Sequence, residues 1–105
     1  MADDILQRVR EAADKRLLFL PHTIRQMARP DRMIATTEVE AVVITGEVIE
    51  DYPEDARGHS CLILGYGRDD RAIHVVCAPK DEYLAILTAY LPNPNQWTLD
   101  FKGRL

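Results

Sequence analysis

The apolar residues change their spacing close to Gly46, and this change limits the folds that the chain can adopt. Before Gly46 they recur every three or four residues, as on the buried side of an amphipathic helix. After Gly46 they alternate with other residues, as in strands that bury one face. The chain of 105 residues is therefore predicted to be an α+β domain, with N-terminal helices packed on a four-stranded antiparallel β-meander.

Two helices are expected before residue 30. Residues 3–15 carry apolar side chains at helical spacing, and residues 22–29 lie between Pro21 and Pro30, which fit the start and the end of a helix. The run 17–20 between these helices is too short for its periodicity to distinguish a strand from an extended connector.

The third expected helix has the clearest start signal in the chain. Thr37 and Glu40 fit a capping box, in which each residue bonds the backbone of the other, and Gly46 is a natural terminator. The period-two segments that follow predict strands at residues 48–52, 61–66, 72–78 and 84–91. Pro92 and Pro94 then end the sheet, because proline lacks the N–H that a strand ladder needs.

The composition is that of an ordinary soluble globular protein, with 47% hydrophobic and 29% charged residues. We expect one domain over residues 1–105, with residues 1–16 as an N-terminal helical extension. No apolar run reaches the length of a membrane span, and the first residues lack the pattern of a secretory signal. The chain is therefore expected to be cytoplasmic and not associated with a membrane.

The formal net charge of −4 argues against indiscriminate nucleic-acid binding, which needs a broad basic surface. A local basic site remains open, because residues 22–32 hold three arginines and one acid. Cys61 and Cys77 lie in apolar strand patterns without the spacing of a zinc site, and we expect both to be buried thiols. No phosphate-binding loop, zinc-protease motif or serine-hydrolase motif is present, so no cofactor and no metal are expected.

The remaining polar residues suggest cleavage of RNA without a metal. His22 and His74 are candidate acid–base groups, because one imidazole can take the 2′-OH proton while another protonates the leaving 5′-oxygen. Arg25 and Arg32 are candidate phosphate contacts, and Tyr90, at the end of the last strand, is a candidate to orient or stack on the RNA. These roles require the side chains to converge in space.

Each of these residues also has an ordinary structural explanation. His74 alternates with apolar neighbours and fits a half-buried strand histidine, whereas His22 stands at a helix start and fits a cap. Arg25 fits a solvated surface arginine. Trp97 is a candidate substrate contact, although its place after two prolines favours a role as the anchor of the C-terminal tail.

An ordered set of short segments over residues 19–101 resembles a family of small bacterial and archaeal proteins known mainly as a domain of unknown function. The segments are His22, Arg25-Gln26-Met27, Arg32, Val39-Glu40, Gly46-Glu47-Val48-Ile49, Tyr52-Pro53, Ser60-Cys61-Leu62, Gly65, Ile73-His74-Val75-Val76, Thr88-Ala89-Tyr90-Leu91-Pro92 and Trp97.

This resemblance implies a fold similar to the RelE/ParE-like toxins of type II toxin–antitoxin pairs. It also implies mRNA cleavage without a metal, and a partner antitoxin encoded alongside. The chain departs from the family around Pro30, where an additional residue displaces Arg32, and in its acidic charge.

We therefore expect a toxin-like endoribonuclease whose partners are RNA and an antitoxin. An alternative is a non-catalytic protein-interaction module of the same fold, in which the histidines are structural. A third and weaker alternative is a metal-dependent hydrolase built on His22, His59 and His74. The oligomeric state does not follow from the sequence.

Overall fold

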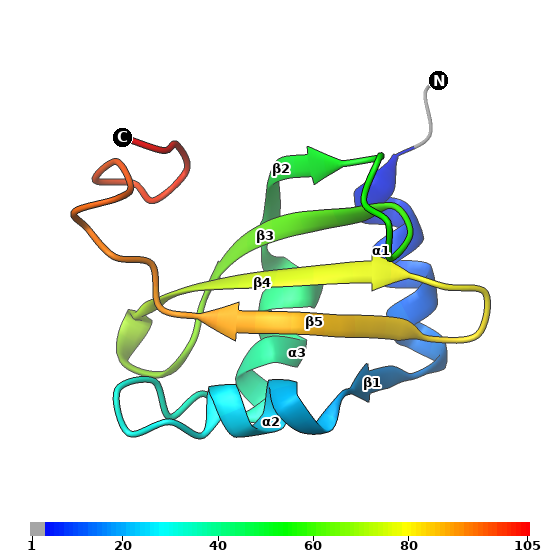
Figure 1. Ribbon diagram of the computed structural model, residues 1–105, viewed down its shortest axis with the longest axis horizontal. Helices are drawn as coiled ribbons and strands as arrows, with labels where there is room; N and C mark the ends of the chain where they lie inside the picture. The colour runs from blue at the N-terminus through cyan, green and yellow to red at the C-terminus, as the bar shows by residue number, and fades with distance from the viewer. Residues whose placement is uncertain (1–3) are drawn as a thin grey trace.

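The computed structural model describes residues 4–105 and has helices and strands in one α+β arrangement (Figure 1). The described elements are α1 (Ile5–Lys15), β1 (Leu17–Phe19), α2 (Pro21–Met27), α3 (Thr36–Thr45), β2 (Glu47–Tyr52), β3 (Ser60–Tyr66), the 3₁₀ turn η1 (Arg68–Asp70), β4 (Ala72–Pro79) and β5 (Leu84–Tyr90). The strand order in the sheet is β1-β5-β4-β3-β2. Helices α1 and α3 lie against one face of the sheet, and α2 lies along the edge next to β5 (Figure 1).

The predicted four strands form β2 to β5, each antiparallel to the next, as expected. The prediction is wrong in leaving out a fifth strand, because β1 pairs in parallel with β5 and makes the sheet mixed. Leu17 lies opposite Leu84, and Phe19 lies opposite Ile86. A run this short shows no periodicity, and its strand conformation comes from the free edge of β5, which lies far away in the sequence.

The first two helices follow the predicted pattern with small changes at their ends. Asp4 caps α1, because its Oδ1 accepts a hydrogen bond of 3.0 Å from the backbone N–H of Leu6. Residue 3, where this helix was expected to begin, lies outside the described residues. Helix α2 starts at Pro21, one residue before the predicted range, and ends at Met27, before the predicted end at residue 29.

The start of α3 differs from the predicted capping box. The helix begins two residues earlier, with Ala35 at the N-cap position, so that Glu38 occupies its third position. The carboxylate of Glu38 accepts a hydrogen bond of 3.0 Å from the N–H of Ala35. The acid that reaches back is therefore Glu38, and the prediction that Thr37 and Glu40 form the box is wrong.

The main core lies between the helices and one face of the sheet. Its fully buried side chains include Val9, Val39, Val42, Val43, Ile63, Ile73, Val75 and Ile86. Cys61 and Cys77 are buried opposite each other on β3 and β4, which confirms the predicted buried thiols. At Gly65 a Cβ atom would lie only 2.9 Å from the Cα of Val42, so a side chain there would push α3 away from β3.

The opposite face of the sheet carries no helix in the described chain and is partly covered by the C-terminal tail, residues 91–105. After β5 the tail runs along one end of the sheet toward the β2 side (Figure 1). A bridge between Trp97 and Arg104 folds it into a small hairpin, and Trp97 is only 4% exposed. No helix in the described part of the chain is long and apolar enough to cross a membrane.

Candidate functional site

One group of predicted site residues lines an open hollow of about 270 Å³ on α2. The residues that line it are His22, Arg25, Gln26 and Arg29, which are all exposed. Within the described chain, the side chains of His22 and Arg25 form no hydrogen bond or ion pair, whereas Arg29 forms an exposed ion pair of 3.2 Å with Asp31. The lining therefore holds an imidazole, two guanidinium groups and an amide, and no carboxylate.

The opposite side of α2 explains why these side chains face solvent. Thr23 is fully buried, and its hydroxyl donates to the carbonyl oxygens of Leu87, at 3.0 Å, and Ile86, at 3.3 Å. Met27 is also buried, in the core. Residues four apart share a helix side, so anchoring Thr23 and Met27 against β5 turns His22 and Arg25 outward.

Arg32 lies beside this hollow but uses its guanidinium within the chain. Its Nη1 donates to Gln26 Oε1 at 3.2 Å and to the carbonyl oxygen of Ala89 at 3.3 Å. Arg32 therefore ties the loop after α2 to the end of β5 and orients Gln26. Because the Gln26 oxygen is occupied, the NH₂ group of its amide is left to donate.

The buried carboxylate of Glu38 supports the loop after α2, which carries Arg32 and Met33. Glu38 accepts hydrogen bonds from the Arg71 guanidinium and from the backbone N–H of Arg68. The same guanidinium donates to the carbonyl oxygens of Arg32 and Met33, and both of these bonds are 2.7 Å long. Burial alone would raise the pKa of Glu38, but the hydrogen bonds from Arg71 and two backbone N–H groups outweigh it and lower the pKa to about 2. This role of Glu38 is not predicted from the sequence, in which Glu38 has the pattern of an exposed helix residue.

His74 lies far from solvent, on the tail side of the sheet. It has no exposed surface, its Nε2 lies 2.9 Å from the carbonyl oxygen of Phe101, and its Nδ1 lies 3.2 Å from the hydroxyl of Tyr90. A carbonyl oxygen only accepts, so Nε2 carries the proton and Nδ1 accepts from Tyr90. Burial lowers the pKa of His74, against the opposing effects of the Phe101 carbonyl and Glu50. The ring is thus a neutral structural group in this conformation.

His74 belongs to a connected group that we call the tail cluster: Glu50, Tyr52, His74, Tyr90, Trp97 and Arg104. The rings of Trp97 and His74 meet edge to face, with centroids 4.5 Å apart. Arg104 lies over the Trp97 ring, 4.6 Å from its centroid, and its Nε and Nη2 donate to the two Glu50 oxygens at 2.8 and 3.0 Å. Tyr52 donates to Glu50 as well.

Glu50 and Arg104 belong to this cluster but are not among the residues predicted from the sequence. Alternation along β2 places Glu50 and Tyr52 on the same face, and this signal could have linked them. No local pattern links Arg104 to either residue, because its partners lie on a distant strand.

The predicted residues thus form two separate groups. His22 and Arg25 share the α2 hollow, whereas His74, Tyr90 and Trp97 share the tail cluster, and the lining of the hollow includes none of these three. The described contacts do not bring the two histidines to one point, as a two-imidazole mechanism would need.

The third histidine has separate partners. His59 contacts Asp51 through Nε2 at 2.5 Å and Arg8 through Nδ1 at 3.1 Å, and so links the loop before β3 to β2 and α1. Among the described residues, no group of three or more His, Cys, Asp or Glu side chains is arranged to hold a metal ion. The metal-hydrolase alternative therefore has no support from this arrangement.

The family of the chain follows from comparison with known proteins. Residues 19–91 match the family described as Domain of unknown function (DUF4258). The chain belongs to the DUF4258 family. No curated protein and no solved structure matches it, and no comparison links it to the RelE/ParE toxins.

The DUF4258 segment contains the whole α2 hollow and four members of the tail cluster, Glu50, Tyr52, His74 and Tyr90. Trp97 and Arg104 lie after the matched residues. The tail cluster therefore joins side chains of the DUF4258 segment to two side chains of the tail.

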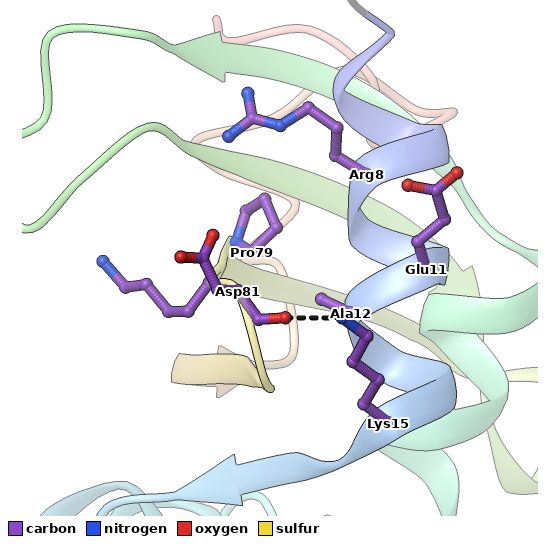
Figure 2. Close-up of a pocket in the computed structure, with 7 residues that line it drawn as sticks. Arg8, Glu11, Ala12, Lys15, Pro79 and Asp81 are labelled. Atoms are coloured by element: carbon purple, nitrogen blue, oxygen red, sulfur yellow. Dashed lines mark hydrogen bonds between the residues drawn. The ribbon is translucent and has the colours of Figure 1, made fainter.

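A second hollow, of about 240 Å³, lies between α1 and the connection from β4 to β5. It contains none of the site residues predicted from the sequence. The residues that line it are Arg8, Glu11, Ala12, Lys15, Pro79, Lys80 and Asp81. Figure 2 shows Lys15 of α1 donating to the carbonyl oxygen of Asp81, at 2.7 Å. Its mixed charges and this cross-link fit the docking of α1 on the DUF4258 segment better than the binding of a charged ligand.

Proposed function

We propose that this DUF4258 protein binds single-stranded RNA through the α2 hollow and cleaves it with His22, as the toxin of a type II toxin–antitoxin pair. The observation that carries the proposal is the hollow itself. It gathers an imidazole, two guanidinium groups and an amide in a chain whose formal net charge is −4. Guanidinium groups are the side chains best suited to phosphate oxygens, because they donate in a planar fork.

The side chains of the hollow fit separate parts of the reaction. Arg25 and Arg29 would contact the scissile phosphate, and the Gln26 amide, oriented by Arg32, would donate to a non-bridging oxygen. His22 would take the proton of the 2′-OH, whose oxygen attacks phosphorus. The bond from phosphorus to the 5′-oxygen breaks, that oxygen takes a proton from water, and a 2′,3′-cyclic phosphate remains.

These assignments change the roles expected from the sequence for three residues. Arg32 orients Gln26 instead of contacting phosphate. His74 is a positioning residue here, because both of its ring nitrogens are bonded within the chain. Tyr90 is likewise bonded to His74, so neither contacts the RNA phosphate in this proposal.

Binding and cleavage of a fluorescent single-stranded RNA by the purified full chain test the proposal. Arg25→Ala should weaken binding about tenfold, and His22→Ala should leave binding intact while slowing cleavage by about 10²-fold or more. Lys102→Ala, which removes an exposed cation paired with Glu47, is the matched control and should change neither. Wild-type protein that neither binds nor cleaves RNA would overturn the proposal.

A non-catalytic interaction module is the second candidate, and the sealed environment of His74 favours it. One of the two predicted catalytic imidazoles has no exposed surface. RNA binding without cleavage, or stable co-purification with the product of the adjacent gene without any RNA activity, would support this candidate over the first.

A further inference from the structure

Arg104 of the tail is held by contacts that a nucleobase could also make. Two donors on one edge of its guanidinium bond the two oxygens of Glu50, and its guanidinium carbon lies over the ring of Trp97. Bidentate bonding to a carboxylate together with stacking on an indole selects a flat group with two parallel donors.

Among the four RNA bases, guanine alone presents such an edge. Its N1–H and N2–H groups are adjacent parallel donors, as are the Nε–H and Nη2–H groups of arginine. Adenine and cytosine each place one amino donor beside an acceptor nitrogen, and uracil places its single donor between two carbonyl oxygens. Proteins read single-stranded RNA by bonding these base edges and by stacking on aromatic rings.

We propose that Glu50, Tyr52 and Trp97 form a guanine-binding site, which Arg104 occupies when no RNA is bound. The proposal rests on the proposed function, because it supplies the base preference of the same RNA-binding protein. Guanine would displace the Arg104 guanidinium, bond both oxygens of Glu50 and stack on the face of Trp97 that Arg104 covers.

The surrounding contacts keep this site in shape without Arg104. Tyr52 donates to Glu50 from the same strand, and His74 supports the edge of the Trp97 ring from below. While Arg104 is in place, its hydrogen bonds and that of Tyr52 lower the pKa of Glu50 although burial opposes them.

Arg104 itself is easy to displace. Its side chain is 61% exposed, so the guanidinium can leave Glu50 for water while the backbone bridge between Trp97 and Arg104 keeps the tail folded. Water competes for the exposed guanidinium, which limits what this ion pair contributes to stability.

The guanine site and the α2 hollow lie at different places on the molecule. Glu50 is on β2, at one edge of the sheet, whereas α2 packs near β5, toward the other edge (Figure 1). β2 and β5 are three strand spacings apart, about 14 Å. A short single strand of RNA could therefore place one phosphate in the hollow and a guanine several nucleotides away at Glu50.

The test is a titration of the full chain with GMP and with AMP, followed by tryptophan fluorescence. Trp97 is the only tryptophan, so the signal reports on this site alone. GMP should quench the fluorescence and AMP should not. Glu50→Gln should weaken GMP binding about tenfold or more, because one oxygen acceptor becomes a donor, and Arg104→Met should tighten binding by removing the competing group.

The neighbouring ion pair supplies matched controls. Lys102 forms an ion pair of 3.1 Å with Glu47, which lies on β2 like Glu50. This pair has the same two charges as the pair of Arg104 and Glu50. Glu47→Gln and Lys102→Met should leave GMP binding unchanged. If Glu50→Gln fails to fold, Arg104→Met still tests the site, because this substitution leaves β2 unchanged and is expected to tighten GMP binding.

Three results would overturn the guanine site: equal binding of AMP and GMP, equal weakening by Glu47→Gln, or binding of N-acetylargininamide without binding of GMP. The last result would assign the site to an arginine of a partner protein. RNA binding that depends on Arg25 but shows no effect of GMP would reject this site and leave the proposed function standing.

Discussion

Glu38 shows how strongly one carboxylate can depend on its surroundings. It accepts from Arg71 and from the backbone N–H groups of Ala35 and Arg68, and its side chain is 10% exposed. Because Arg71 also holds the carbonyl oxygens of Arg32 and Met33, this carboxylate supports the loop that carries Arg32 to Gln26. Met33 has a positive φ of 49°, a conformation that costs energy outside glycine and that these bonds stabilise.

Glu38→Gln should destabilise the protein by about 3 kcal/mol at pH 7, which is the value of lowering a pKa from 4.5 to about 2. The folded pKa lies below the unfolded one, so this stabilisation is complete above about pH 4.5 and disappears as the pH falls toward 2. Urea unfolding of both proteins across this range measures the effect. Glu40→Gln, on an exposed residue of the same helix, is the control, and an equal loss from both variants would contradict the account.

The two histidines illustrate what sequence reasoning can reach at this scale. Helical spacing correctly predicts that His22 and Arg25 share one side of α2. Strand alternation correctly assigns His74 to a sheet face, but the groups that seal it, Trp97 and Phe101, come from the tail, which has no regular pattern. Burial of a polar strand residue depends on such distant segments, so the sequence alone leaves His74 open as either a half-buried or a catalytic histidine.

At the scale of elements, the sheet edge explains the position of α2. On the edge of β5 that faces away from β4, no described strand continues beyond the three pairs with β1, and Thr23 and Arg32 donate to carbonyl oxygens of β5 instead. Helix α2 thus replaces a strand along half of β5. The same attachment explains the error in the predicted meander, since a three-residue strand and a seven-residue helix share one edge.

The tail should loosen when His74 is protonated. Its pKa is lowered in the fold, so the folded state binds this proton less readily than the unfolded state, and stability falls as the pH drops below about 6.5. The fluorescence of Trp97 should therefore change between pH 7 and pH 5. His74→Leu should abolish this change and, by leaving the Phe101 carbonyl unpaired, destabilise the protein by about 1–3 kcal/mol. His22→Ala is the control, and a pH response that survives in His74→Leu would refute this role.

At the scale of the whole molecule, the structure separates two sets of polar side chains that the sequence presents as one. The α2 hollow lies at one edge of the sheet and the tail cluster extends from β5 to β2. The three helices and the four antiparallel strands follow from local periodicity and turn residues. The tail cluster does not, because Arg104 and Glu50 are 54 positions apart and meet only after the tail has folded back.

Formation of a 2′,3′-cyclic phosphate from RNA is the measurement that tests the central claim most directly. Mass spectrometry of a single-stranded RNA after incubation with the full chain should show this end group, whereas DNA of the same sequence, which lacks the 2′-OH, should stay intact. His22→Ala should slow the reaction by about 10²-fold or more, and His59→Ala, which removes an imidazole elsewhere, should not. Cyclic phosphate formed at the same rate by His22→Ala, or no product from the wild-type protein, would contradict the account.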